Sequence, residues 1–377
     1  MLKLKHGVLT LLILTVVGMT FSCIPRSDVV GDFWKVGSTN IRVLIDKRKV
    51  FRLFSTGRLL FVEGIPLERE ISVSLDKTNI VVNGITLGER VDVYSDGNII
   101  FDGIEYSGFF RLVAEGSVVM VINVVELEEY LESVVPSEVP ALWPMEVLKA
   151  QAIVSRTYAL RRILDSKGKE YDVLSSYKSQ VYSGVKKVHE RTSRAVRETR
   201  GVVITYKGEI ISAFFHANSG GLIESPEVIG ARYLPYLKPS VDRFSQDTYR
   251  SFWSTYIPKG SFLKGLFGND NLKLVAIEIP YRMPSGSVRE IRVTATDGKD
   301  KVTVEIDVNR FREVFPSVLS PKFEIETDGY GITFKGYGWG HGVGMSQWGA
   351  KAMADQGYNY REIIKYYYKD VDIENLY

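Results

Sequence analysis

The stretch that decides the fold spans residues 135–165 and reads VPSEVPALWPMEVLKAQAIVSRTYALRRILD. Proline suits the first position of a helix, so Pro144 favours a helix start, and we predict a helix from about Pro144 to Asp165. Apolar side chains surround most of its axis, which is typical of a buried helix. Lys149 and Arg156 lie on one face of it, seven residues apart. Buried cations need partners, so we expect them to point at a carboxylate network or a polar groove.

Short apolar runs separated by turn residues precede this helix. They predict a β-rich N-terminal region over residues 41–105. Beyond the central helix we expect a polar helix over residues 189–200, a loop-rich stretch over residues 239–268, and further strands and short helices. Many strands with a few segregated helices predict an α+β fold, in which a mixed catalytic domain over residues 106–377 contains the buried central helix.

The N-terminus is typical of an export signal. Lys3 and Lys5 precede an apolar run that is too short to span a bilayer, and this run ends at Cys23. We predict a signal peptide over residues 1–22, a tether over residues 23–40, and lipid attachment at Cys23. A plain cleaved signal and an uncleaved anchor are the alternatives. Each of them places the mature protein outside the cytoplasm, and lipidation would anchor it to the membrane.

Composition narrows the function classes. Hydrophobic residues make up 45% and charged residues 25% of the 377 residues, as in a globular protein with a sizeable core. The single cysteine excludes an intrachain disulfide and a zinc site built on cysteines. The net charge of +3 is small, and no basic run is interleaved with aromatic residues. We therefore expect no nucleic-acid partner.

Glu138 is the first candidate for chemistry. It lies between Pro136 and Pro140, just before the central helix, and flanking prolines restrict the backbone that carries a side chain. Apolar neighbours such as Trp143 would raise its pKa, whereas a nearby cation such as Lys149 would lower it. A carboxylic acid that stays neutral near pH 7 can protonate a glycosidic oxygen. Taken alone, Glu138 favours a helix cap or a salt bridge over this catalytic role.

A glycine-rich segment, GYGWGHGVGMSQ at residues 336–347, is the second candidate. Its glycines allow positive φ angles and a close approach of the backbone to a ligand, and they expose His341. The segment has neither a Walker lysine nor a dinucleotide fingerprint. His189, His216 and His341 lack metal-ligand spacing, so we predict no metal and no cofactor.

A third segment, FFHANSGG at residues 214–221, places His216 and Ser219 in a glycine-rich turn. The same residues fit a simple transition from strand to turn.

Together these segments resemble the SpoIID/LytB family, which comprises stage II sporulation protein D and the proteins once called amidase enhancers. The resemblance covers roughly residues 106–368. It rests on six segments in the family's order, at residues 121–131, 134–140, 146–158, 179–184, 215–221 and 338–349.

This resemblance implies a peptidoglycan lytic transglycosylase, which cleaves glycan strands between N-acetylmuramic acid and N-acetylglucosamine and leaves a 1,6-anhydro sugar. Glu138 matches the family's catalytic glutamate. By the same resemblance the substrate groove would be lined by Lys149, Arg156, Gln180, Tyr182, His216, Ser219, His341 and Gln347. Some members carry a zinc cluster of His and Cys just before the segment at 179–184. Residues 174–179 contain neither, so we predict no zinc there.

A second function class stays open from the sequence. The family also suggests a noncatalytic wall-binding protein that stimulates a cell-wall amidase, which would then be a partner. A metal hydrolase is a third reading. The sequence leaves a sporulation role and general wall turnover as alternatives.

Overall fold

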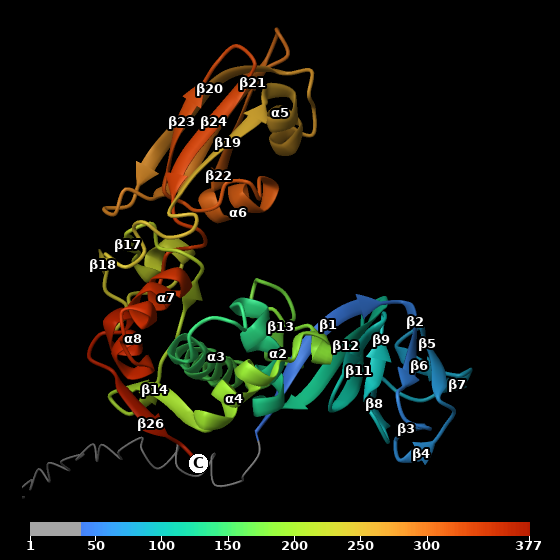
Figure 1. Ribbon diagram of the computed structural model, residues 1–377. Coiled ribbons are helices and arrows are strands. Elements are labelled where there is room, and N and C mark those ends of the chain that lie inside the picture. Colours follow the sequence, from blue (N-terminus) through green and yellow to red (C-terminus); the bar gives the residue numbers. More distant parts are fainter. Residues whose placement is uncertain (1–38) are drawn as a thin grey trace, which may run out of the picture. The chain divides into compact units, whose positions relative to one another are not determined.

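The computed structural model describes residues 39–377 (Figure 1). Helices and strands are both abundant in these residues, and the predicted α+β class is confirmed. The predicted signal peptide, the predicted lipid attachment at Cys23 and all but the end of the predicted tether lie outside the described residues. None of the helices within residues 39–377 is both long enough and apolar enough to cross a bilayer.

Two sheets precede the first described helix (blue to green in Figure 1). Their strands are β1 (Asn40–Arg48), β2 (Val50–Ser55), β3 (Leu60–Val62), β4 (Ile65–Pro66), β5 (Glu70–Asp76), β6 (Asn79–Val82), β7 (Ile85–Thr86), β8 (Arg90–Ser95), β9 (Ile99–Phe101), β10 (Ile104–Tyr106), β11 (Phe109–Glu115) and β12 (Val118–Glu126), with β13 (Val173–Leu174) from later in the chain. One sheet has the order β13-β1-β12-β11-β8-β3-β4 and the other β10-β9-β2-β5-β6-β7. Because β1 pairs with β12, strands from both sides of residue 105 share one sheet.

The central helix follows these sheets. Helices α2 (Leu127–Glu138), α3 (Met145–Asp165) and α4 (Glu190–Glu198) pack against one another, and the 3-10 turn η1 (Gly184–Lys187) precedes α4. The helix predicted from Pro144 is α3, with Pro144 as its N-cap, and most of its residues are buried as expected.

The sequence favours a short helix over residues 126–133, with the chain interrupted at Pro136. Helix α2 differs from this expectation. It continues through Pro136 and ends at Glu138. Proline lacks an N–H donor and its ring crowds the carbonyl four residues earlier, so Pro136 disfavours the helix locally. The buried side chains of α2 nevertheless continue to Val134 and Val135, and this packing carries the helix past Ser133. The N–H of Val139 still closes that turn by donating to the carbonyl of Val135 at 3.0 Å.

The remaining elements around α3 are small sheets and two C-terminal helices. They are β14 (Val202–Tyr206), β15 (Glu209–Ile210), β16 (Phe215–His216), β17 (Leu222–Ile223), η2 (Pro226–Ile229), β18 (Ser240–Val241), β25 (Met345–Ser346), α7 (Gln347–Asp355), α8 (Tyr360–Tyr367) and β26 (Asp372–Asn375). The parallel pair β16·β25 joins two segments that are about 130 residues apart in the chain.

Residues 252–337 form a β-rich module with a hydrophobic core of its own. It contains β19 (Phe252–Pro258), α5 (Lys259–Phe267), β20 (Lys273–Arg282), β21 (Val288–Thr296), β22 (Lys301–Asp307), α6 (Val308–Val314), β23 (Phe323–Thr327) and β24 (Gly331–Tyr337). The loop-rich prediction for residues 239–268 is therefore wrong from Phe252 onward. Strand β19 is completed only by pairing with β24, which is far away in the sequence.

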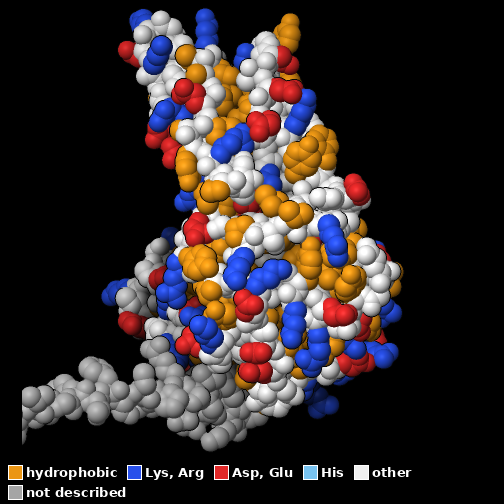
Figure 2. Space-filling view, turned by 90° about the vertical axis from the view of Figure 1, so that its left-hand side faces the viewer, with side chains coloured by type: hydrophobic (Ala, Val, Ile, Leu, Met, Phe, Trp, Pro, Cys, Tyr) orange, Lys and Arg blue, Asp and Glu red, His pale blue; other side chains and the backbone are white. Residues whose placement is uncertain are grey.

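The surface drawn in Figure 2 interleaves hydrophobic side chains with basic and acidic ones. Such a mixed surface is ordinary for a globular protein.

Candidate active site

Glu138 is the last residue of α2, so a helix end positions its side chain rather than a proline-bounded turn. Its Oε1 accepts a hydrogen bond of 2.8 Å from the backbone N–H of Val181, and its carboxyl also hydrogen-bonds the side chain of Gln347. The side chain is half-buried. Burial raises the pKa of Glu138, although both hydrogen bonds and the charge of Lys187 act against that rise. The site therefore holds a carboxyl that is more readily protonated than usual.

Gln347 connects Glu138 to a buried polar network on α3. Its Nε2 donates to Oε1 of Gln151 at 3.4 Å, and Nε2 of Gln151 donates to Oγ of Ser155 at 3.1 Å. All three side chains are buried. A satisfied buried network restrains its members, so the amide of Gln347 is held in a fixed place beside Glu138.

Gln180 and Tyr182 flank Val181 and are both buried. Oε1 of Gln180 accepts a hydrogen bond from the hydroxyl of Tyr130 at 3.2 Å, and the hydroxyl of Tyr182 donates to Asn123 at 2.7 Å. These bonds fix the backbone on both sides of Val181 and so hold its N–H toward Glu138. Gln180 and Tyr182, which were predicted to line the groove, are thus buried, and they position the N–H of Val181.

Lys149 and Arg156 are bound to carboxylates other than Glu138. Nζ of Lys149 lies 2.7 Å from Glu198, and the fully buried Arg156 makes two hydrogen bonds of 2.7 Å to Glu128. Of the two environments expected for these cations, the structure shows the carboxylate network. Arg156 is correspondingly inaccessible to a substrate, since its exposed fraction is 0%.

His216 and His341 lie together where β16 pairs with β25, with ring centroids 5.6 Å apart. Nδ1 of His216 donates to the carbonyl of Val343 at 3.1 Å, while Nδ1 of His341 accepts from the N–H of Val343 at 3.0 Å. Burial lowers the pKa of His216 well below its usual range and that of His341 to about 4. Both rings are therefore neutral near pH 7.

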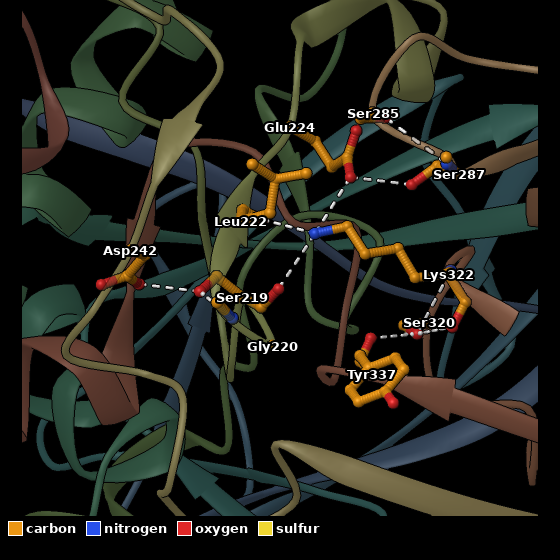
Figure 3. A network of polar contacts seen from close by, with 12 residues as sticks. Ser219, Gly220, Leu222, Glu224, Asp242, Ser285, Ser287, Ser320, Lys322 and Tyr337 are labelled. Atoms are coloured by element: carbon orange, nitrogen blue, oxygen red, sulfur yellow. Dashed lines mark hydrogen bonds and ion pairs between the residues drawn. The ribbon is translucent and has the colours of Figure 1, made fainter.

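The hydroxyl of Ser219 is engaged in a buried network (Figure 3). Its Oγ donates to Asp242 at 2.7 Å, and its carbonyl accepts from Nζ of Lys322 at 3.1 Å. Nζ of Lys322 also lies 3.0 Å from Oε1 of Glu224, which is fully buried. Since Lys322 belongs to the module of residues 252–337, this network ties that module to the turn that carries Ser219.

Three groups around Glu138 escaped the sequence reasoning. The N–H of Val181 is a backbone group, so no side-chain pattern could have revealed it. Lys187 lies in η1, outside every segment singled out above. Gln151 could have been found, because it lies on the matched stretch of α3, four residues from Ser155 and so on the same helix face.

Within residues 39–377, no group of three or more His, Cys, Asp or Glu side chains is arranged to hold a metal ion.

Comparisons with known proteins match the part of the chain that carries Glu138. The model of the family described as Stage II sporulation protein matches residues 115–206, which contain Glu138, α3 and Val181. The chain is 33% identical over 322 residues to an uncharacterized protein of Brachyspira hyodysenteriae, covering 81% of this chain and 85% of that protein.

Two relatives carry functional names. The amidase enhancer of Bacillus subtilis is 28% identical over 348 residues, which cover 79% of this chain but only 48% of that longer protein. Stage II sporulation protein D of Bacillus amyloliquefaciens is 28% identical over 269 residues, covering 66% of this chain and 74% of that protein. On these matches, and with Glu138 in the matched region, the chain belongs to the SpoIID/LytB family of stage II sporulation protein D and amidase enhancer.

Proposed function

We propose that this protein is an exported lytic transglycosylase of peptidoglycan, with Glu138 as both acid and base. Its substrate would be the bond between N-acetylmuramic acid and N-acetylglucosamine in the glycan strand. The observation that carries the proposal is one half-buried carboxyl of raised pKa in the family's matched segment. It is held by Val181 of that segment and by Gln347, which lies outside it.

The reaction needs one carboxyl in two protonation states. Protonated Glu138 gives its proton to the oxygen that links the sugars, and the bond from the muramic C1 to that oxygen breaks. The Glu138 carboxylate then accepts the proton of the C6 hydroxyl, and the C6 oxygen forms a bond to C1. The products are a 1,6-anhydro-muramic end and a free hydroxyl on the departing sugar. Protons balance, and no water is consumed.

The environment of Glu138 suits both states. Burial favours the neutral acid that begins the reaction. The N–H of Val181 and the side chain of Gln347 stabilise the carboxylate that follows, as does the charge of Lys187. A two-carboxylate glycoside hydrolase needs a second carboxyl to activate water. Among the described residues, the groups that act on Glu138 are Val181, Gln347 and Lys187, and none of them is a carboxyl.

The test is mass spectrometry of purified glycan strands after incubation with the protein. We expect 1,6-anhydro ends with the wild type and none with Glu138→Gln, which keeps the size of the side chain. Glu132→Gln is the matched control, because Glu132 lies on the same helix and hydrogen-bonds Ser193 instead. Anhydro ends made equally well by Glu138→Gln would refute the proposal.

The second candidate is a noncatalytic protein that stimulates a cell-wall amidase, which the name of the Bacillus subtilis relative favours. Release of stem peptides by a purified amidase, measured with and without this protein, separates the two. Equal stimulation by wild type and Glu138→Gln, with no anhydro ends from either, would establish the second function.

We also propose that Cys23 is lipidated and anchors the protein to the membrane outside the cytoplasm. The experiment compares wild type with Cys23→Ser in membrane fractions of the producing cell. Wild type in the membrane fraction and the variant in the soluble exported fraction is the expected result. Equal membrane retention would contradict lipid attachment.

A further inference from the structure

Four aromatic rings in mutual contact, those of Trp143, Trp348, Tyr249 and Trp339, form a platform (hereafter the aromatic platform). The ring centroids of Trp143 and Trp348 are 4.9 Å apart, and Trp348 directly follows Gln347, the residue that hydrogen-bonds Glu138. The aromatic platform therefore starts one residue from a direct partner of the carboxyl.

From Trp348 the aromatic platform continues outward. Tyr249 lies 5.3 Å from Trp348 and 6.4 Å from Trp339, measured between ring centroids. Tyr249 is 53% exposed, while Trp339 and Trp348 are half-buried. These three rings thus present part of their surface to solvent, although burying them would gain hydrophobic free energy.

Buried hydrogen bonds hold the aromatic platform in place. Nδ2 of Asn218, a residue that is 1% exposed, donates to the carbonyl of Tyr249 at 2.9 Å. The backbones of Asn218 and Trp339 exchange two hydrogen bonds of 2.8 and 2.9 Å, and the N–H of Trp348 donates to Ala217 at 3.0 Å. Two consecutive residues of one turn therefore set the positions of three aromatic residues.

Arg250 adds a positive charge to the aromatic platform. Its guanidinium carbon lies 4.5 Å from the ring centroid of Trp339 and 5.3 Å from that of Tyr249. The side chain is exposed, and no carboxylate within residues 39–377 forms an ion pair with it. Its backbone has a φ of 58°, a left-handed conformation that costs a non-glycine residue about 1–2 kcal/mol. Such strain is concentrated at functional sites.

We propose that the aromatic platform is a subsite for sugar rings of the glycan strand and that Arg250 binds a carboxylate carried by that strand. Sugar rings present faces of C–H groups, which stack on aromatic rings, while tyrosine and tryptophan add polar edges for hydroxyl groups. An exposed guanidinium that lacks a carboxylate partner supplies paired N–H donors for a carboxylate. This subsite deepens the function proposed above, on which its ligand rests.

The test measures binding with the Glu138→Gln protein, in which no cleavage should disturb the equilibrium. Tryptophan fluorescence follows the titration of three probes: chitohexaose, glycan strands stripped of peptides, and strands that keep them. Since one lost stacking contact of about 1.4 kcal/mol is a tenfold change in Kd, we expect Tyr249→Ala to weaken every probe about tenfold. Tyr330→Ala, at a position that is 84% exposed on the turn before β24, is the matched control and should bind like the parent.

Arg250→Met separates the charge from the rings. We expect weaker binding of the carboxylate-bearing strands and unchanged binding of neutral chitohexaose. A loss with stripped strands identifies the carboxylate of muramic acid, and a loss confined to peptide-bearing strands identifies the peptide. Parent-like binding of all probes by both Tyr249→Ala and Arg250→Met would overturn the subsite, even if the wild type makes anhydro ends. Conversely, platform-dependent binding without anhydro ends would refute only the proposed reaction.

Discussion

The backbone N–H of Val181 donates a hydrogen bond of 2.8 Å to Oε1 of Glu138 and so joins the end of α2 to a segment 43 residues further along the chain. The flanking side chains of Gln180 and Tyr182 are buried and hydrogen-bonded, which fixes this N–H. A backbone donor survives every substitution of Val181 except proline. The position of the Glu138 carboxyl is thus determined by buried residues that lie behind it.

Removing the amide of Gln347 should change the pH dependence of glycan cleavage. The hydrogen bond from Gln347 lowers the pKa of Glu138, so Gln347→Met should raise that pKa further. Since Glu138 must be protonated at the start, the alkaline limb of the rate profile should move to higher pH. One hydrogen bond of about 1 kcal/mol corresponds to a shift of somewhat less than about one pH unit.

The measurement is the rate of anhydro-end formation against pH. Gln356→Met, at an exposed position directly after α7, is the control and should keep the profile of the wild type. An alkaline limb that stays in place or moves to lower pH in Gln347→Met would show that Gln347 does not act on Glu138.

Breaking the pair of Arg156 and Glu128 should destabilise the fold severely. Arg156→Met leaves the Glu128 carboxylate buried without its cation, which costs about 3–5 kcal/mol of unfolding free energy. Urea unfolding followed by circular dichroism measures the loss. The exposed pair of Arg161 and Asp165 provides the control, since Arg161→Met should cost only about 0.5 kcal/mol or less. Similar losses in the two variants would contradict a structural role for Arg156.

His216 and His341, whose pKa values are both lowered in the fold, should make the protein less stable in mild acid. The pKa of His341 is lowered to about 4, whereas an unfolded histidine has a pKa of about 6.5. Between these values the unfolded chain binds a proton that the folded chain does not, so stability falls as the pH falls. The slope is at most about 1.4 kcal/mol per pH unit for each histidine.

Thermal unfolding at pH 7 and pH 5 tests this sign. The decrease in Tm on acidification should be smaller for His341→Gln than for the wild type, because the variant lacks one of the two groups. His216 should contribute in the same direction, since its pKa is also lowered by burial. An unchanged decrease in His341→Gln would mean that His341 is not held neutral by the fold.

Gly338 should tolerate a side chain poorly. Its φ is 82°, and a Cβ built on it would lie 2.7 Å from the carbonyl oxygen of Asn218. Gly357 has a φ of 90° with nothing within 4 Å of such a Cβ. Alanine at either site costs about 1–2 kcal/mol for the left-handed backbone, and Gly338→Ala should cost more because a backbone atom blocks it. Equal losses in thermal unfolding would contradict this close approach.

The sequence predicted correctly those helices and strands that depend on residues within the same segment. The helix expected from Pro144 to Asp165 is α3 within one residue, because its periodicity and its N-terminal proline act within the segment itself. Strand β19 was missed because its partner β24 is about 80 residues away. The end of α2 was also missed, because its buried side chains continue past Ser133 to Val135, and this packing outweighs the break that a proline favours.

For the candidate site, the sequence alone supplied Glu138 and the family segments, and the α+β class followed from the succession of strands and helices. Only the tertiary structure decided which way the polar side chains point. In the structure Gln347 hydrogen-bonds Glu138, and Arg156 pairs with Glu128. Gln180 is buried and accepts a hydrogen bond from Tyr130. The physical reason is that a buried polar group takes whichever partner the packing brings within hydrogen-bond distance, and that partner is distant in the chain.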